Sequence, residues 1–259
     1  MASQKPILVV AGVGNATGTG AATAREFAKK GYRVALVARN AEHLEKAASE
    51  IRNDGGEAQA FPVSEYSYAE IHKVFEEVKK QWPNDQIRVS VWNAGFGVWK
   101  PFLETTEEEV KESVNTNIVA AFAFAKESIL AFKGQECVKC SSLLNDIGAR
   151  GTLIFTSATA AWRGNVTTSA FSAGKHGLKA LAQSLNKEFG KQNIHVAHAI
   201  IDGSILTDRY KNTRAAELHE NEDVRLNPEG IAKAYVYLAQ QDRSAWTFEL
   251  DLRPAHEKW

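Results

Sequence analysis

The chain has 259 residues, and its 31 lysine and arginine residues balance its 31 aspartate and glutamate residues. A chain of this length forms one domain or at most two, and its zero net charge argues against nucleic acid or an anionic membrane as a partner. The N-terminal segment lacks a signal-peptide pattern, and the apolar run Ile7–Val13 is too short to span a bilayer. We therefore expect a cytoplasmic protein with no membrane partner.

Strand and helix patterns alternate along the whole chain. Strands are predicted at Ile7–Val13, Arg33–Ala38, Ala58–Val63, Ile87–Trp92, Thr152–Ser157, Ile194–Ile201 and Trp246–Leu250. Helices are predicted at Ala22–Lys30, Ala41–Asn53, Tyr68–Gln81, Thr106–Phe132, Ala170–Phe189 and Pro228–Gln240. This alternation predicts an α/β fold: one doubly wound Rossmann domain, residues 1–259, with about seven parallel strands and helices on both faces of the sheet.

A glycine-rich segment follows the first predicted strand. Gly14, Gly18 and Gly20 precede a helix, and Arg33–Ala38 then completes a βαβ unit. Glycines let the backbone turn sharply and approach a phosphate, which also benefits from the positive end of a helix. We expect these glycines and Thr19 to hold the pyrophosphate of a dinucleotide. The alternative is a loop that only reverses the chain.

The two cysteines, Cys137 and Cys140, form a single C-x-x-C pair within the polar stretch Lys133–Gly151, which we interpret as a surface excursion. No matching histidine or cysteine pair stands at a spacing suited to zinc, so no metal site is predicted. Two free thiols are the simpler interpretation, and a redox or metal role is the alternative.

Four motifs in order resemble those of the short-chain dehydrogenase/reductase family. They are the glycine segment Gly14–Gly20, Asn93–Gly95 after the fourth strand, Phe171-x-x-x-Lys175 on a helix, and Asp202–Thr207 after the sixth strand. The resemblance covers essentially the whole chain. It implies a Rossmann fold, a nicotinamide cofactor and hydride transfer to or from a carbonyl or alcohol. It also implies homodimers or homotetramers built on the two long helices.

The charge after the second strand indicates which nicotinamide cofactor is bound. The family binds a ribose 2′-hydroxyl with an acidic residue there, whereas this chain has Arg39. A guanidinium pairs with a 2′-phosphate, so NADP(H) is expected; a solvated loop charge is the alternative. The chain departs from the family at Pro62, which replaces an aspartate, and at Asp202, which replaces a proline.

The resemblance assigns further cofactor contacts. Asn93 and Gly95 match the turn beside the adenine-side ribose, and Val63 matches the residue that packs beside the adenine. Thr207 matches the residue that hydrogen-bonds the carboxamide, and Lys175 the lysine that binds the nicotinamide ribose.

The family's catalytic Asn-Ser-Tyr-Lys set is incomplete in this chain. Asn117 and Lys175 match, but Phe171 stands at the tyrosine position and Ala158 at the serine position. A one-residue shift offers Ser157 in place of the lost serine. Phenylalanine has no proton to donate, which would remove about 10²–10⁴-fold of general acid catalysis.

Other hydroxyls could replace the missing phenol. Thr159 lies beside the lost serine, and Tyr210, on a loop that closes over substrate in this family, is the best candidate; it could also be an ordinary loop tyrosine. The predicted catalytic set is Lys175, Asn117, Ser157 and Tyr210.

Three functions remain open. The first is an NADP(H)-dependent oxidoreductase acting on a carbonyl, enone or iminium-type small molecule. The second is a non-redox enzyme on the same scaffold, such as a cyclase, isomerase or dehydratase. The third is a catalytically silent NADPH-binding protein. Loops rich in aromatic residues around Trp99, Trp162 and Tyr210 favour a mid-sized, mostly apolar substrate.

Overall fold

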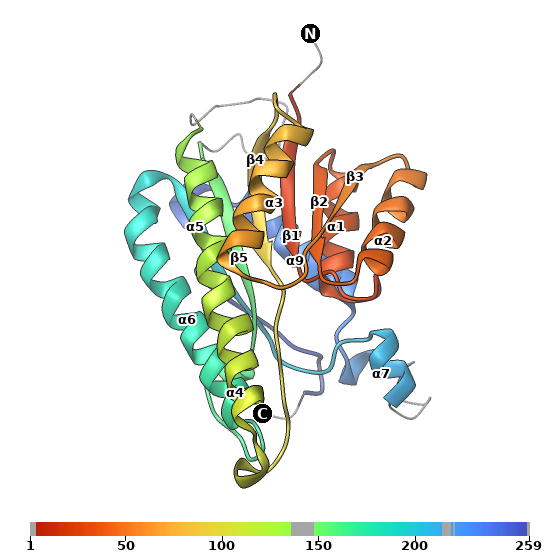
Figure 1. Ribbon diagram of the computed structural model, residues 1–259, viewed down its shortest axis with the longest axis vertical. Helices are drawn as coiled ribbons and strands as arrows, with labels where there is room; N and C mark the ends of the chain where they lie inside the picture. The colour runs from red at the N-terminus through yellow and green to blue at the C-terminus, as the bar shows by residue number, and fades with distance from the viewer. Residues whose placement is uncertain (1–3, 136–147, 214–218, 220, 258–259) are drawn as a thin grey trace.

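The computed structural model describes residues 4–135, 148–213, 219 and 221–257, so Cys137 and Cys140 lie outside the described residues. Seven strands form one sheet in the order β3-β2-β1-β4-β5-β6-β7, and every neighbouring pair is parallel (Figure 1). Their bounds are β1 Pro6–Ala11, β2 Arg33–Ala38, β3 Glu57–Pro62, β4 Gln86–Trp92, β5 Gly151–Ala158, β6 Ile194–Ile201 and β7 Glu249–Leu252. The parallel α/β fold is confirmed.

Helices cover both faces of this sheet. One face packs against α1 (Thr19–Lys29), α2 (Ala41–Asn53) and α9 (Pro228–Gln240). The other packs against α3 (Tyr68–Gln81), α5 (Ala120–Lys133) and α6 (Ser169–Phe189). Two further helices, α4 (Glu107–Val114) and α7 (Asp208–Thr213), lie toward the lower end of the molecule in Figure 1, beyond the carboxyl ends of the strands. Among the described residues, no helix is long and apolar enough to cross a membrane.

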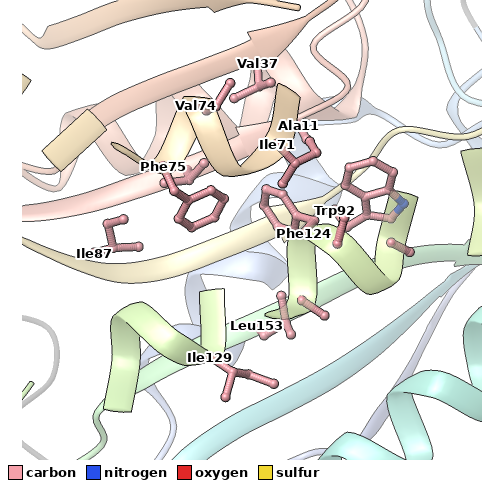
Figure 2. Close-up of a cluster of buried hydrophobic side chains, with 14 of the residues drawn as sticks. Ala11, Val37, Ile71, Val74, Phe75, Ile87, Trp92, Phe124, Ile129 and Leu153 are labelled. Carbon is pink, nitrogen blue, oxygen red and sulfur yellow. The ribbon is translucent and has the colours of Figure 1, made fainter. Parts of the chain in front are cut away.

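Aromatic rings fill the space between the sheet and the helices α3 and α5 (Figure 2). Trp92 at the end of β4 contacts Phe124 of α5 with ring centroids 5.3 Å apart, and Phe124 contacts Phe75 of α3 at 5.5 Å. All three side chains are buried. This packing fixes the carboxyl end of β4, where the chain enters the candidate site.

The strand order reverses at β1, which lies between β2 and β4. The chain runs outward from β1 to β2 and β3, then returns to the other side of β1 as β4. A crevice opens beyond the carboxyl ends of the strands at such a point, and ligands of doubly wound folds bind there.

Several predicted bounds need correction at the strand and helix ends. The first strand ends at Ala11 rather than Val13, because the backbone turns at Gly12 to pack against Asn93 and Ala94. The last strand is Glu249–Leu252 rather than Trp246–Leu250, because two hydrogen bonds to the Gln241 side chain hold Thr247 in the irregular segment before the strand. Other observed ends that differ by one to three residues are those of α1, β3, β4, β5 and α6.

The predicted helix Thr106–Phe132 is interrupted. Thr106 and Glu109 form the expected capping box at the start of α4. A π-helical turn, Asn115–Val119, then separates α4 from α5. Such turns often occur at functional sites, and here the turn carries Asn117, one of the predicted catalytic residues.

Candidate active site

The turn after β1 packs directly against the turn after β4. Gly12 has a φ of +92°, and a Cβ on it would lie 2.3 Å from the backbone nitrogen of Ala94. A Cβ on Gly20 would lie 2.4 Å from the carbonyl oxygen of Gly12. Asn93 joins the two turns, because its Nδ2 donates to the same oxygen at 2.7 Å. Sequence reasoning missed Gly12, whose signal was its place at the end of the apolar run.

The loop before α1 has the backbone features of an anion site. Gly18 precedes the helix and has no side chain with which to cap its first N–H groups. These groups and the helix dipole attract an anion. Gly14 and Ala16 have φ angles of 67° and 70°, so the loop bends twice through left-handed conformations. The buried Thr19 hydroxyl has no hydrogen-bond partner among the described residues.

The segment that begins α7 lies against this loop. The Asp208 backbone N–H donates to the Thr17 hydroxyl at 3.1 Å, and Asn15 Nδ2 donates to the Asp208 carboxylate at 3.4 Å. A Cβ on Gly18 would lie 3.6 Å from the methyl group of Thr207. The structure therefore brings Thr207 next to the glycine loop, although the two are far apart in sequence.

Arg39 lies in a cleft of about 400 Å³ beyond β2. Its half-exposed guanidinium pairs with the Glu112 carboxylate at 3.2 Å and lies 5.6 Å above the ring of Tyr66. Gly14 and His43 also line this cleft, which can hold a planar base and an anionic group. A bound 2′-phosphate would compete with Glu112 for the guanidinium.

Val63 lies in the hydrophobic core on the α3 side of the sheet, and its N–H donates to Ala38 O at 3.1 Å. It is not among the residues that line the cleft, whereas Tyr66 is. The sequence analysis did not single out Tyr66, because it follows β3 in an irregular segment without a motif.

Asn117 is fully buried and connects the π-helical turn to the segment after β4. Its Nδ2 donates to Phe96 O at 2.8 Å and to Ser113 Oγ at 3.2 Å, and its Oδ1 accepts from Phe96 N at 3.3 Å. A Cβ on Gly95 would approach Lys175 Nζ to 3.3 Å and Asn117 Oδ1 to 3.4 Å. Gly95, Asn117 and Lys175 thus meet at one point.

Lys175 is buried on α6, where its Nζ donates to Thr156 O at 3.1 Å. Burial lowers the pKa of Lys175 from 10.5 to about 8, because the charged form loses its hydration. The ammonium lies 5.9 Å from the ring centre of Phe171, which contacts Trp99 at 5.1 Å. The lysine therefore has the aromatic ring of Phe171 beside it.

A second cleft, of about 870 Å³, opens around Lys175. The predicted site residues that line it are Asn93, Gly95, Ser157, Lys175, Thr207 and Tyr210. The Ser157 hydroxyl is buried and has no hydrogen-bond partner among the described residues. Tyr210 is half-buried on α7, with its ring 5.9 Å from that of His219. Both residues thus line the same cleft as Lys175.

Comparisons with known proteins agree with this geometry. The family model described as short chain dehydrogenase matches residues 7–218. A rat 3-oxoacyl-[acyl-carrier-protein] reductase is 28% identical over 236 residues, covering 90% of this chain and 91% of the relative. A short-chain dehydrogenase structure from Rhodopseudomonas palustris is 30% identical, with a TM-score of 0.78 and coverage of 97% and 100% of the two chains.

An alcohol dehydrogenase structure from Thermococcus sibiricus, complexed with 5-hydroxy-NADP, has a TM-score of 0.80 at 22% identity and covers 99% of each chain. This last likeness shows the fold alone. The match of the family model over most of the chain, together with the glycine loop and the buried lysine, shows that the protein belongs to the short-chain dehydrogenase family.

Proposed function

We propose that this protein is an NADP(H)-dependent oxidoreductase that transfers a hydride to or from a small molecule of the carbonyl, enone or iminium type. One observation carries the proposal. The glycine loop at the start of α1 and the buried Lys175 lie at the same carboxyl edge of the sheet, and Asn93 and Gly95 link the clefts beside them. A dinucleotide that runs from Arg39 to Lys175 would occupy both clefts.

The residues present fit such a cofactor. Gly12 and Gly20 pack too closely for any larger residue, and the first N–H groups of α1 have no side-chain cap. The Thr19 hydroxyl is buried at the start of the helix without a described partner, as expected of a group that awaits a phosphate oxygen. Arg39 would bind the 2′-phosphate, and Lys175 the nicotinamide-side ribose.

The site's own residues limit the substrates. When bound, the nicotinamide ring supplies or accepts the hydride. The Lys175 ammonium stabilises negative charge that develops on a substrate oxygen, but Phe171 cannot donate a proton to it. The loss of a general acid raises the barrier by about 3–5 kcal/mol. An iminium ion or a polarised enone tolerates this loss better than a simple ketone, because its carbon is already electrophilic.

Fluorescence titration with NADPH and NADH tests the proposal. We expect the wild type to bind NADPH more tightly, and Arg39→Ala to weaken NADPH by about 10–100-fold while NADH changes little, since one charge-assisted pair is lost. Arg52→Ala is the matched control: its guanidinium pairs with Glu45 on α2 and does not line either cleft. Equal weakening of both nucleotides by Arg39→Ala would contradict the 2′-phosphate assignment.

Because Phe171 has no hydroxyl, two other functions also remain open. A non-redox cyclase, isomerase or dehydratase, or a silent NADPH-binding protein, needs no phenol beside Lys175. Nicotinamide absorbance followed during a substrate screen separates the oxidoreductase from the non-redox enzyme. Turnover with a change in absorbance supports the oxidoreductase, and turnover without that change supports the non-redox enzyme. If neither NADPH nor NADH binds at millimolar concentration, the oxidoreductase proposal fails.

The partners proposed for this protein are a small-molecule substrate and further copies of the same chain, in a homodimer or homotetramer. A cytoplasmic location also remains a prediction, which imaging of the tagged protein in its cells would test.

A further inference from the structure

A buried carboxylate lies behind the cleft that contains Lys175. Asp202 follows β6 and is 5% exposed. The Thr159 hydroxyl donates a hydrogen bond to its Oδ1. Its Oδ2 faces Arg253 Nη2 at 3.5 Å and makes no hydrogen bond to a described residue. A buried charge is costly unless paired, and here Arg253 and Thr159 are the groups that face the two oxygens of the carboxylate.

The ends of three strands fix this pair. In the β5–β6 register Ala158 lies opposite Ile201, which places the next residues, Thr159 and Asp202, side by side. The Asp202 N–H donates to Leu252 O of β7 at 2.8 Å. Thr159 and Asp202 are therefore held by the sheet itself rather than by a surface loop.

The hydrogen-bond capacity of Thr159 determines what it can recognise. A threonine hydroxyl has one hydrogen and two lone pairs. Because the hydrogen goes to Asp202, the oxygen can only accept a hydrogen bond from a molecule in the cleft. Thr159 lines that cleft together with Phe171 and Lys175. The complementary substrate group is therefore a donor, such as a hydroxyl.

Thr159 and Lys175 are also anchored to the same strand end. Lys175 Nζ bonds the carbonyl oxygen of Thr156, three residues before Thr159. An alcohol whose oxygen lies between the two groups would face the ammonium on one side and an accepting oxygen on the other. Phe171 offers neither function, and its ring would instead limit the space beside the carbinol carbon.

We propose that Thr159 and Asp202 take the proton of the substrate in place of the missing phenol, and that the substrate is an alcohol that this enzyme oxidises. This inference rests on the proposed function. The carbinol C–H bond would break with loss of a hydride, which the oxidised nicotinamide nucleotide would accept when bound. The O–H proton passes to Thr159 Oγ1 as the proton of Thr159 passes to Asp202 Oδ1, and a C=O bond forms. Asp202 returns its proton to water after the ketone or aldehyde leaves.

Three variants of the whole chain test this proton relay, in which the substrate's proton passes to Thr159 as that of Thr159 passes to Asp202. Thr159→Val removes the hydroxyl at nearly constant shape, and Thr159→Ser retains it. Asp202→Asn removes the base. Thr105→Val is the matched control, because this threonine donates its hydrogen to Pro101 O and lines neither cleft. The probe is a panel of secondary alkyl and aryl alcohols with NADP⁺. NADPH affinity is measured for every variant in parallel.

We expect kcat to fall by about 10²–10⁴-fold in Thr159→Val and Asp202→Asn. Thr159→Ser and Thr105→Val should stay within about threefold of the wild type, and NADPH affinity should be unchanged throughout. Rescue by serine separates proton transfer from a structural role. If Asp202→Asn fails to fold, the comparison of Thr159→Val with Thr159→Ser still tests the proton transfer.

Two results would overturn the relay and leave the proposed function standing. One is alcohol oxidation within about threefold of wild type in a folded Thr159→Val variant. The other is a wild-type protein that binds NADPH but oxidises no alcohol of the panel. A wild-type protein that binds neither nucleotide instead overturns the proposed function itself.

Discussion

At the scale of single residues, Lys175 links the stability of the fold to pH. Burial lowers its pKa to about 8, whereas the unfolded chain keeps a value of 10.5. Between these two values the unfolded state binds more protons than the folded state, so this group makes the protein more stable as the pH rises. The upper limit of the effect is about 3 kcal/mol across the whole interval.

We expect Lys175→Met to remove that dependence. Urea denaturation between about pH 7.5 and 9.5 should show a free energy of unfolding that rises more steeply in the wild type than in the variant. The comparison cancels the contribution of the buried tyrosines, because both proteins contain them. Parallel curves for the two proteins would mean that Lys175 keeps an ordinary pKa in the fold.

The residue at position 171 lies where it could influence which substrates react. Its ring already lies against Trp99 and 5.9 Å from Lys175 Nζ. Phe171→Tyr would add a phenol beside Lys175, so we expect reduction of simple ketones to rise by about 10²-fold or more. Phe171→Leu is the control for altered packing. Equal ketone activity in the two variants would show that a phenol at this position does not reach the substrate.

At the scale of elements, the proposed nucleotide site depends on the close approach of α1 to the turn after β1. A Cβ on Gly20 would lie 2.4 Å from Gly12 O, a backbone atom that cannot move without shifting the turn. We therefore expect Gly20→Ala to weaken NADPH binding by about 100-fold or more, equivalent to about 3 kcal/mol. Gly190→Ala is the matched control, because no atom lies within 4 Å of its added Cβ.

NADPH titration and thermal unfolding of the two glycine variants together give a clear outcome. If Gly20→Ala is folded but no longer binds NADPH, the substitution has disturbed the glycine loop before α1 and not the fold. Wild-type affinity in Gly20→Ala would show that the approach of α1 to Gly12 is not needed for binding.

The sequence allowed the strands and helices to be predicted because their signal is local. Apolar runs and helical periodicity recovered β2, α2, α3, β6 and α9 with their observed bounds. The misplaced end of β1 depended on a contact with Ala94, far along the chain, which no local pattern contains. The same holds for the π-helical turn, which accompanies the bonds of Asn117 to Phe96.

The candidate site was predictable to the extent that it follows motifs. Glycine spacing indicated the close-packed loop before α1, and the Phe171-x-x-x-Lys175 spacing indicated the buried lysine. The carboxylate of Asp202 was visible only as a departure from the family's pattern. Its contact with Thr159 depends on β5–β6 pairing and so required the three-dimensional structure.

At the scale of the whole molecule, an apolar stripe lies along α4, the π-helical turn and α5. Val110, Val114, Val119 and Phe122 are each between 37% and 45% exposed, which is unusual for apolar residues on consecutive turns. They recur every three to five residues, and the wider π-helical turn spans the five-residue step from Val114 to Val119. The stripe is a continuous surface suited to a second copy of the chain.

Phe122→Asp should therefore shift the protein toward the monomer. Sedimentation velocity would show a wild-type dimer or tetramer and a lighter variant, because burial of a carboxylate in an apolar contact without a partner is unfavourable. Val166→Asp is the control, since Val166 is 89% exposed but lies in the segment after β5, outside the stripe. A wild-type monomer would contradict the proposed assembly. An oligomer that persists in Phe122→Asp would place the interface on another surface, because an unpaired charge on the stripe is unfavourable between two copies of it.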